Sequence, residues 1–222
     1  MRTESVSRQG AQWNYSYATQ WEGGSVPYGY PTCYVTQVTA VAPDGGVTVV
    51  EGGAGQFTIT DPLGRVTTYT VETWNGTTFE NLHAIESGRI LSTVYPEGNR
   101  VDYTYARGNV SGITVTPKPG QGSATVVFEA AYPSVCTVAT MRTCNRPLYT
   151  IDARGARTDY TYHAPSGMVQ TVTLPAGPDG IRPQVRYTYQ QLQARYMNAS
   201  GLLVYTGRPI WKLVSTSRCR TQ

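Results

Sequence analysis

Asp152-Ala153-Arg154-Gly155-Ala156-Arg157-Thr158-Asp159-Tyr160-Thr161-Tyr162 is the stretch of this chain that decides its fold. A turn signal comes first, with Asp and Gly at the first and fourth positions of a type I turn. A strand signal follows, in which tyrosines alternate with polar residues. The pattern Gly-x-x-x-x-Tyr-x-Tyr recurs at Gly10 with Tyr15 and Tyr17 and at Gly98 with Tyr103 and Tyr105, and a near copy runs from Gly64 to Tyr69. Such a repeat predicts a β scaffold, because a catalytic motif normally occurs once.

The repeat glycines are interpreted as turn residues. A type I turn followed by a left-handed residue is a common hairpin connection, and glycine adopts positive φ without a Cβ penalty. No GxGxxG or P-loop pattern surrounds these positions, which argues against a phosphate-binding role. The turn glycines predicted in this way are Gly10, Gly64, Gly98 and Gly155.

The repeat tyrosines follow the period of a strand. In Val101-Asp102-Tyr103-Thr104-Tyr105, one face carries the apolar and aromatic residues and the other carries Asp102 and Thr104. Aromatic side chains on one face pack against their cross-strand neighbours, so stability is expected to accumulate along the array. The tyrosines assigned to these ladders are Tyr15, Tyr17, Tyr69, Tyr103, Tyr105, Tyr160, Tyr162, Tyr187 and Tyr189.

The organisation of the chain is predicted to be all-β, an array of antiparallel β-hairpins forming a curved or spiralling sheet. The composition of 17 Tyr, 23 Gly and 14 Pro suits short strands and tight turns. Residues 1–222 are read as a single β region, with the clearest units at 56–74, 88–116 and 147–175 and degenerate units at 8–18 and 183–190. Only residues 79–85 carry a weak helical pattern, and the opening half-repeat suggests origin from something longer.

Charge and hydropathy exclude several classes of function. The formal charge of +4 comes from 18 basic and 14 acidic residues without runs, so no nucleic-acid partner is predicted. No stretch approaches the length of a membrane span, and the N-terminus lacks the apolar core of a signal peptide. No metal or other cofactor is predicted.

Four cysteines bear on the compartment. Cys136 and Cys144 enclose seven residues, and the pair is a candidate structural disulfide if the surroundings are oxidising. The spacing fits no zinc pattern, and His83 and His163 are not arranged as ligands. Cys33 and Cys219 could pair with each other, stay free, or, for Cys219, bond outside this chain.

The candidate catalytic groups favour structural interpretations, so the chain is predicted not to be an enzyme. Asp152 and Asp159 flank one turn as a conceivable acid/base pair, but turn capping for Asp152 and a solvated strand face for Asp159 are favoured, because nothing in the sequence supplies the tuned partner that acid/base catalysis needs. Neither histidine lies near a recognisable nucleophile. The tryptophans could stack on sugars, although aromatic packing of the sheet is the simpler role; they are Trp13, Trp21, Trp74 and Trp211.

These motifs resemble the YD repeats of the RHS family. The resemblance rests on the stretch from Asp152 to Tyr162, which continues through Gly167-Met168-Val169-Gln170-Thr171-Val172-Thr173-Leu174-Pro175, and on residues 95–116. It is clear over roughly half the chain. The aspartate that follows the second tyrosine in the family is replaced here by Ala18, Ala106 and His163, and the self-cleaving core segment has no counterpart.

The resemblance implies strips of antiparallel sheet that spiral into a hollow shell, enclosing a toxin or presenting a surface outside the cell. The expected function is therefore a non-enzymatic structural segment of a secreted or cell-surface shell protein. Its expected partners are the remainder of a larger chain or identical subunits joined through sheet edges. Two alternatives stay open: a glycan- or protein-binding β module, and a self-assembling extracellular fibre subunit.

Overall fold

The computed structural model describes residues 2–8, 11–22, 32–53, 55–72 and 89–220. Within these ranges the chain forms strands, turns and loops and no helix, so the all-β prediction is confirmed. The strands are β1 (Arg2–Arg8), β2 (Ala11–Glu22), β3 (Thr32–Val41), β4 (Val47–Gly53), β5 (Gln56–Thr60), β6 (Val66–Val71), β7 (Ile90–Val94), β8 (Arg100–Ala106), β9 (Asn109–Thr116), β10 (Thr125–Ala131), β11 (Tyr149–Asp152), β12 (Arg157–Tyr162), β13 (Val169–Thr173), β14 (Pro183–Leu192), β15 (Arg195–Met197), β16 (Leu203–Tyr205) and β17 (Ile210–Arg220).

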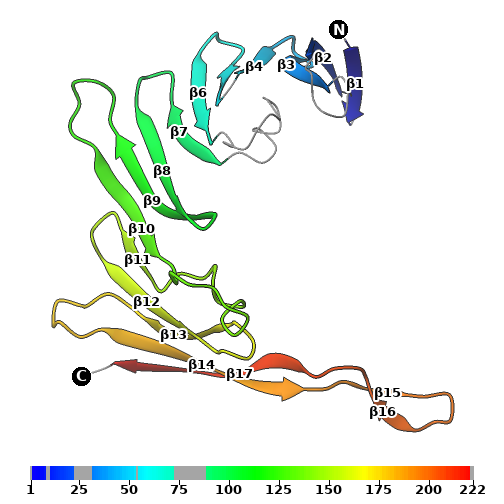
Figure 1. The fold of residues 1–222 in the computed structure, drawn as a ribbon, viewed down its shortest axis with the longest axis vertical. Coiled ribbons are helices and arrows are strands. Elements are labelled where there is room, and N and C mark those ends of the chain that lie inside the picture. The colour runs from blue at the N-terminus through cyan, green and yellow to red at the C-terminus, as the bar shows by residue number, and fades with distance from the viewer. Residues whose placement is uncertain (1, 9–10, 23–31, 54, 73–88, 221–222) are drawn as a thin grey trace. The chain divides into compact units, whose positions relative to one another are not determined.

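Strand pairing follows the order of the chain. Fifteen of the described strands form one sheet in which β1 to β14 lie in sequence order and β17 pairs with β14 (Figure 1). Strands β15 and β16 form a separate two-stranded sheet. The pairings are antiparallel, as in β5–β6 and β12–β13. The helical pattern at 79–85 lies outside the described residues, and none of the described residues forms a helix that could cross a membrane.

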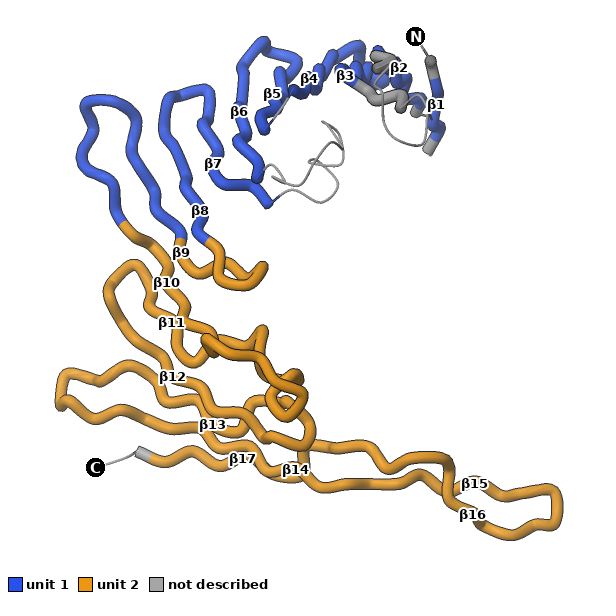
Figure 2. The backbone as a smooth tube through the Cα atoms, viewed as in Figure 1, with its two compact units in different colours: residues 1–104, 113–125 blue, residues 105–112, 126–222 orange. Residues whose placement is uncertain are grey.

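The described residues divide into two compact units, coloured separately in Figure 2. Unit 1 comprises residues 1–104 and 113–125, and unit 2 comprises residues 105–112 and 126–222. The same hairpin turn occurs in both. In unit 1, Gly64 N–H donates to the Asp61 carbonyl; in unit 2, Gly155 N–H donates to the Asp152 carbonyl, both at 2.9 Å.

Little of the described chain is fully buried. The hydrophobic side chains buried among the described residues are Val71 in unit 1 and Ala130 and Cys144 in unit 2. Most strand residues are half-buried, with each side chain in contact with its cross-strand neighbours and with solvent. Packing within each unit therefore depends on ladders along the sheet.

A β-bulge recurs in the strand that pairs with the second aromatic position of the repeat. The register shifts opposite Val71 in β6, Tyr162 in β12 and Tyr189 in β14, and the residues left without a partner are Leu91 in β7, Gln170 in β13 and Val214 in β17. A bulge adds one residue to one strand, bends it and increases its local twist. In these three units the strand opposite the second aromatic position is therefore the bent one, whereas the shift in β2 lies between Ala18 and Thr19.

Candidate functional site

The repeat turns are closed by their own side chains. Asp152 Oδ1 accepts hydrogen bonds from the N–H groups of Arg154 and Ala156, both at 2.9 Å. The N–H of Ala156, and then that of Arg154, lower the pKa of Asp152 below its ordinary value. Gly155 has a φ of +76°. Asp152 is therefore held as a turn-closing carboxylate in this structure.

The other predicted turn glycines show how much of this arrangement depends on aspartate. Asp61 Oδ1 accepts from Leu63 and Arg65 N–H, both at 2.9 Å, beside Gly64 at a φ of +76°. Gly98 has a φ of +88° in a turn that starts with Tyr95 and is closed by main-chain bonds. Gly10 lies outside the described residues.

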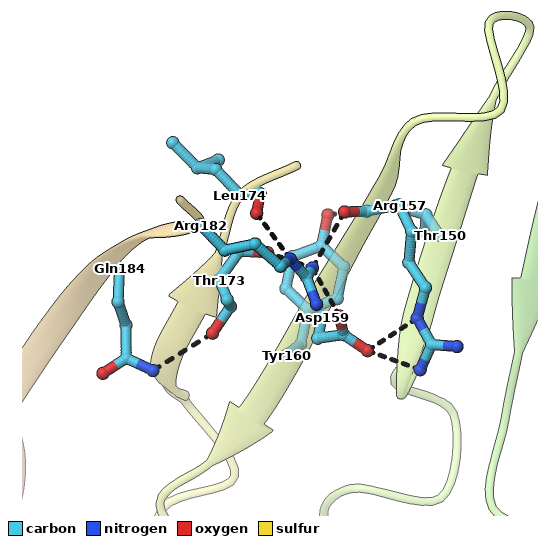
Figure 3. A network of polar contacts seen from close by, with 8 residues as sticks. All are labelled: Thr150, Arg157, Asp159, Tyr160, Thr173, Leu174, Arg182 and Gln184. Carbon is cyan, nitrogen blue, oxygen red and sulfur yellow. Dashed lines mark hydrogen bonds and ion pairs between the residues drawn. The ribbon is translucent and has the colours of Figure 1, made fainter. Parts of the chain in front are cut away.

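Asp159 is the centre of a polar network on unit 2 (Figure 3). Its Oδ1 lies 2.6 Å from Arg157 Nη2, and its Oδ2 lies 2.6 Å from Arg182 Nη2. Partial burial, the largest influence, raises the pKa of Asp159, but hydrogen bonds and charges from the two arginines outweigh it and leave the pKa lowered. The arrangement makes Asp159 an ion-pair partner of Arg157 and Arg182.

Arg182 acts as a clamp across three strands. Its guanidinium donates to the carbonyl of Arg157 on β12 at 2.9 Å and to the carbonyl of Thr173 on β13 at 3.2 Å. Its Nε donates to the Leu174 carbonyl at 3.0 Å. Because Arg182 directly precedes β14, one side chain joins the ends of β12, β13 and β14. The sequence repeat gave no sign of this residue, which lies outside the repeat motif.

Asp159→Asn is expected to make the free energy of unfolding of unit 2 depend less on pH in the acid range. The folded pKa lies below the unfolded value of about 3.9, so the carboxylate contributes stability that is present above the unfolded pKa and lost as the pH falls through the folded pKa. Urea unfolding between pH 6 and pH 2 measures this. The control is Glu97→Gln, an exposed turn carboxyl; equal slopes in both variants would contradict the role of Asp159.

The second tyrosine anchors the sheet through its hydroxyl in two units. Tyr162 Oη donates to the Pro147 carbonyl at 2.7 Å, and Tyr189 Oη donates to the Val169 carbonyl at 2.5 Å. Burial raises the pKa of Tyr162 to about 12. These hydroxyls are therefore structural hydrogen-bond donors, as is usual for buried tyrosines.

The first tyrosines pack along the strands. Tyr69 stacks on Phe57 with ring centroids 4.6 Å apart, and Tyr160 shares a hydrogen bond of 3.3 Å with Thr150. Burial raises the pKa of Tyr103 above its ordinary value. The remaining predicted tyrosines are half-buried on their strands: Tyr15 and Tyr17 on β2, Tyr105 on β8 and Tyr187 on β14.

A loop closed by the Cys136–Cys144 disulfide packs against the β12–β13 turn. The two Cα atoms lie 5.5 Å apart. Arg142 Nη1 donates to the Pro165 carbonyl, and a Cβ added at Gly167 would lie 2.7 Å from the Arg142 carbonyl oxygen. This close approach explains why glycine stands at position 167. Cys219 is free and exposed, whereas the Cys33 side chain lies outside the description.

His163 belongs to an aromatic cluster. Its ring lies edge-on to Trp211 at 4.5 Å and near Tyr189 at 5.4 Å, and Nδ1 is 2.8 Å from Ser166 Oγ. Trp211 thus packs within the sheet, while Trp13 is 40% exposed. His83 and Trp74 lie outside the described residues, as does the Trp21 side chain.

An open polar cleft of about 500 Å³ lies on strands β12, β13 and β14. Its lining includes Thr161, Thr171, Gln184, Arg186 and Thr188. Hydroxyls, amides and one guanidinium can hydrogen-bond a ligand, but they supply no nucleophile with an adjacent base. Within the ranges that the structure describes, no group of His, Cys, Asp or Glu residues is placed to hold a metal ion.

Comparison with known proteins gives distant structural matches. No family model matches the chain, and no curated protein matches it. The crystal structure of TcdB2-TccC3-Cdc42 matches at 13% identity, with 85% of this chain and 11% of that chain covered and a TM-score of 0.38. The Photorhabdus luminescens Tc holotoxin pore gives the same identity and coverage with a TM-score of 0.37. A porin-like protein from Bacteroides uniformis matches at 12% identity over 96% of both chains, with a TM-score of 0.33. The chain thus spans 11% of the length of the toxin-complex chains.

Proposed function

We propose that this chain is a non-enzymatic structural segment of an RHS/YD-repeat shell protein. The observation that carries the proposal is that the chemically capable repeat groups hold the scaffold together. Asp152 closes a turn, Asp159 pairs with two arginines, and the hydroxyls of Tyr162 and Tyr189 bind main-chain carbonyls. A catalytic carboxylate or tyrosine would need to be available to substrate.

The edges of the sheet supply the expected partner. In the described sheet, β1 and β17 each have a strand neighbour on one side only. An uncovered edge presents backbone donors and acceptors that recruit another strand. The partner is therefore the remainder of a larger shell chain or an identical subunit, and the second case is the fibre alternative.

The disulfide favours an extracellular setting. Disulfides form and persist mainly in oxidising compartments. The Cys136–Cys144 bridge closes a loop that contacts a repeat turn, so it belongs to the scaffold. This supports secretion or display at the cell surface.

The edge assignment is tested by sedimentation velocity of the 222-residue chain. The wild-type chain is expected to associate with rising concentration, and Ser215→Lys with Ser217→Lys on β17 should reduce this association because edge lysines oppose strand pairing. Ser200→Lys with Thr137→Lys, at exposed positions away from the edge, is the charge-matched control. A chain that stays monomeric at all concentrations would contradict the proposed edges. In a separate assay, a hydrolase activity of the wild-type chain that is lost in Asp152→Asn would contradict the non-enzymatic assignment.

A glycan-binding module is the second candidate, and the polar cleft is the observation that favours it. Its threonine hydroxyls, glutamine amides and the Arg186 guanidinium match the hydrogen-bonding groups of sugars. Saturable binding on a glycan array that is lost in Arg186→Met would support this function. Unchanged binding in that variant would exclude the cleft as the site.

A further inference from the structure

Charge is distributed unequally along the chain. Residues 181–222 contain seven basic and no acidic residues, whereas residues 1–180 contain eleven basic and fourteen acidic residues. The formal charges of these segments are +7 and −3, which together give the chain its +4. The C-terminal basic residues are Arg182, Arg186, Arg195, Arg208, Lys212, Arg218 and Arg220. Such asymmetry indicates an anionic partner for the C-terminal part.

The basic segment includes a hairpin that extends from the main sheet. This arm comprises residues 192–210 and contains β15 and β16, which lie beyond the ends of β14 and β17 in Figure 1. Within the part of the chain that the structure describes, β15 and β16 pair only with each other. A two-stranded hairpin without further packing is marginally stable in water.

The arm exposes large apolar side chains. Met197 is 67% exposed, Leu202 and Leu203 are each 63% exposed, and Tyr205 is 55% exposed. The register pairs Met197 with Leu203 and Arg195 with Tyr205, so these four side chains lie on one face. Leu202 comes directly before β16, and exposed apolar side chains that gather on one element normally mark an interaction site.

Contacts within the arm favour its hairpin conformation. Asn198 Oδ1 accepts from Ser200 N–H at 3.0 Å and Leu202 N–H at 2.9 Å, the same closure as in the repeat turns. The Arg195 guanidinium lies over the Tyr205 ring at 4.3 Å. A formed surface loses less conformational entropy on binding than a disordered segment does.

We propose that this arm docks on an anionic lipid surface. Met197, Leu202 and Leu203 enter the boundary between headgroups and acyl chains, while Arg195 and Arg208 of the arm and Lys212 of the adjoining β17 lie among the anionic headgroups. Within the described ranges, the ion pairs do not include these three basic side chains. The combination of exposed leucines, tyrosine and basic residues is typical of peripheral membrane elements.

Each of the other possible partners accounts for only one of the two features of the arm, its basic residues or its exposed apolar side chains. A nucleic acid or soluble polyanion would contact the basic residues but gives no reason for exposed Leu202, Leu203 and Met197. An apolar protein surface would cover the leucines but gives no reason for a segment without acidic residues. A lipid surface satisfies both, and this binding goes beyond the structural role proposed above and does not depend on it.

Vesicle sedimentation with the full chain tests the apolar contact. The chain is expected to bind vesicles of phosphatidylcholine with about one third phosphatidylserine at least tenfold more tightly than vesicles of phosphatidylcholine alone. Leu202→Ser with Leu203→Ser should weaken this binding about tenfold, since burial of apolar area contributes to it. Val138→Ser with Met141→Ser is the matched control, because these side chains are 88% and 64% exposed outside the arm. Equal loss in the two double variants would overturn the proposal.

A second pair of variants tests the charges. Arg208→Gln with Lys212→Gln should weaken binding to the anionic vesicles about tenfold, whereas Lys118→Gln with Arg154→Gln, two exposed basic residues elsewhere, should leave it unchanged. Heparin and duplex DNA are titrated in parallel. Binding to either that is as tight as to anionic vesicles and insensitive to Leu202→Ser with Leu203→Ser would overturn the lipid assignment.

Discussion

Gly167→Ala is expected to lower the free energy of unfolding of unit 2 by about 3 kcal/mol. The backbone at Gly167 has a φ of +70°, which costs an L-residue about 1–2 kcal/mol. The added Cβ would also lie 2.7 Å from the Arg142 carbonyl oxygen and 2.9 Å from Arg142 Cβ. Because that oxygen is main chain in a disulfide-closed loop, relief requires the loop to shift, which adds the remaining cost.

Gly155→Ala is the matched control. Its φ of +76° is nearly the same, but nothing lies within 4 Å of the position of its added Cβ. Gly155→Ala should therefore lower the free energy of unfolding only by the cost of the positive φ, about 1–2 kcal/mol. Urea unfolding followed by circular dichroism measures both variants. Equal losses would show that the loop does not press on the turn at Gly167.

Removal of the disulfide is also expected to lower the stability of unit 2 strongly. Cys136→Ala with Cys144→Ala is expected to destabilise unit 2 by about 2.5 kcal/mol, the chain-entropy value for so short a loop. The loop should also separate from its neighbours. Hydrogen exchange should accelerate at the main chain around Asn109, whose Nδ2 donates to Asn145 Oδ1 at 3.1 Å, and around Gly167.

Cys219→Ala is the control for the loss of a thiol, because Cys219 is exposed and unbonded. It should leave both the unfolding midpoint and the exchange rates unchanged. Chemical reduction of the wild-type chain should reproduce the double alanine variant. Unchanged exchange at Gly167 after reduction would show that contacts other than the disulfide hold the loop in place.

The sequence could predict those structural features that depend on residues close together in the chain. The all-β class follows from the spacing of Gly155, Tyr160 and Tyr162, and the structure confirms it. The turn at Asp152 was readable for the same reason, because its carboxylate bonds groups two and four residues ahead. Such interactions are encoded within a handful of consecutive residues.

Features that depend on pairing across strands could not be predicted. The bulge at Gln170 in β13 exists only relative to Thr161 and Tyr162 in β12, and the Arg182 clamp requires β12 and β13 to be placed first. The need for glycine at 167 comes from Arg142, twenty-five positions earlier in the chain. The basic C-terminal segment was visible in the sequence, but its meaning depended on the exposed arm.

The order of the strands bears on how the chain reaches its folded state. From β1 to β14, each strand pairs with the strand made just before it. Pairing between consecutive strands needs shorter loop closures than pairing between strands far apart in the chain, which lowers the entropic barrier to folding. A nascent chain with this order can therefore fold from its N-terminus, one hairpin at a time. Only β17 must wait for the arm to form before it reaches β14.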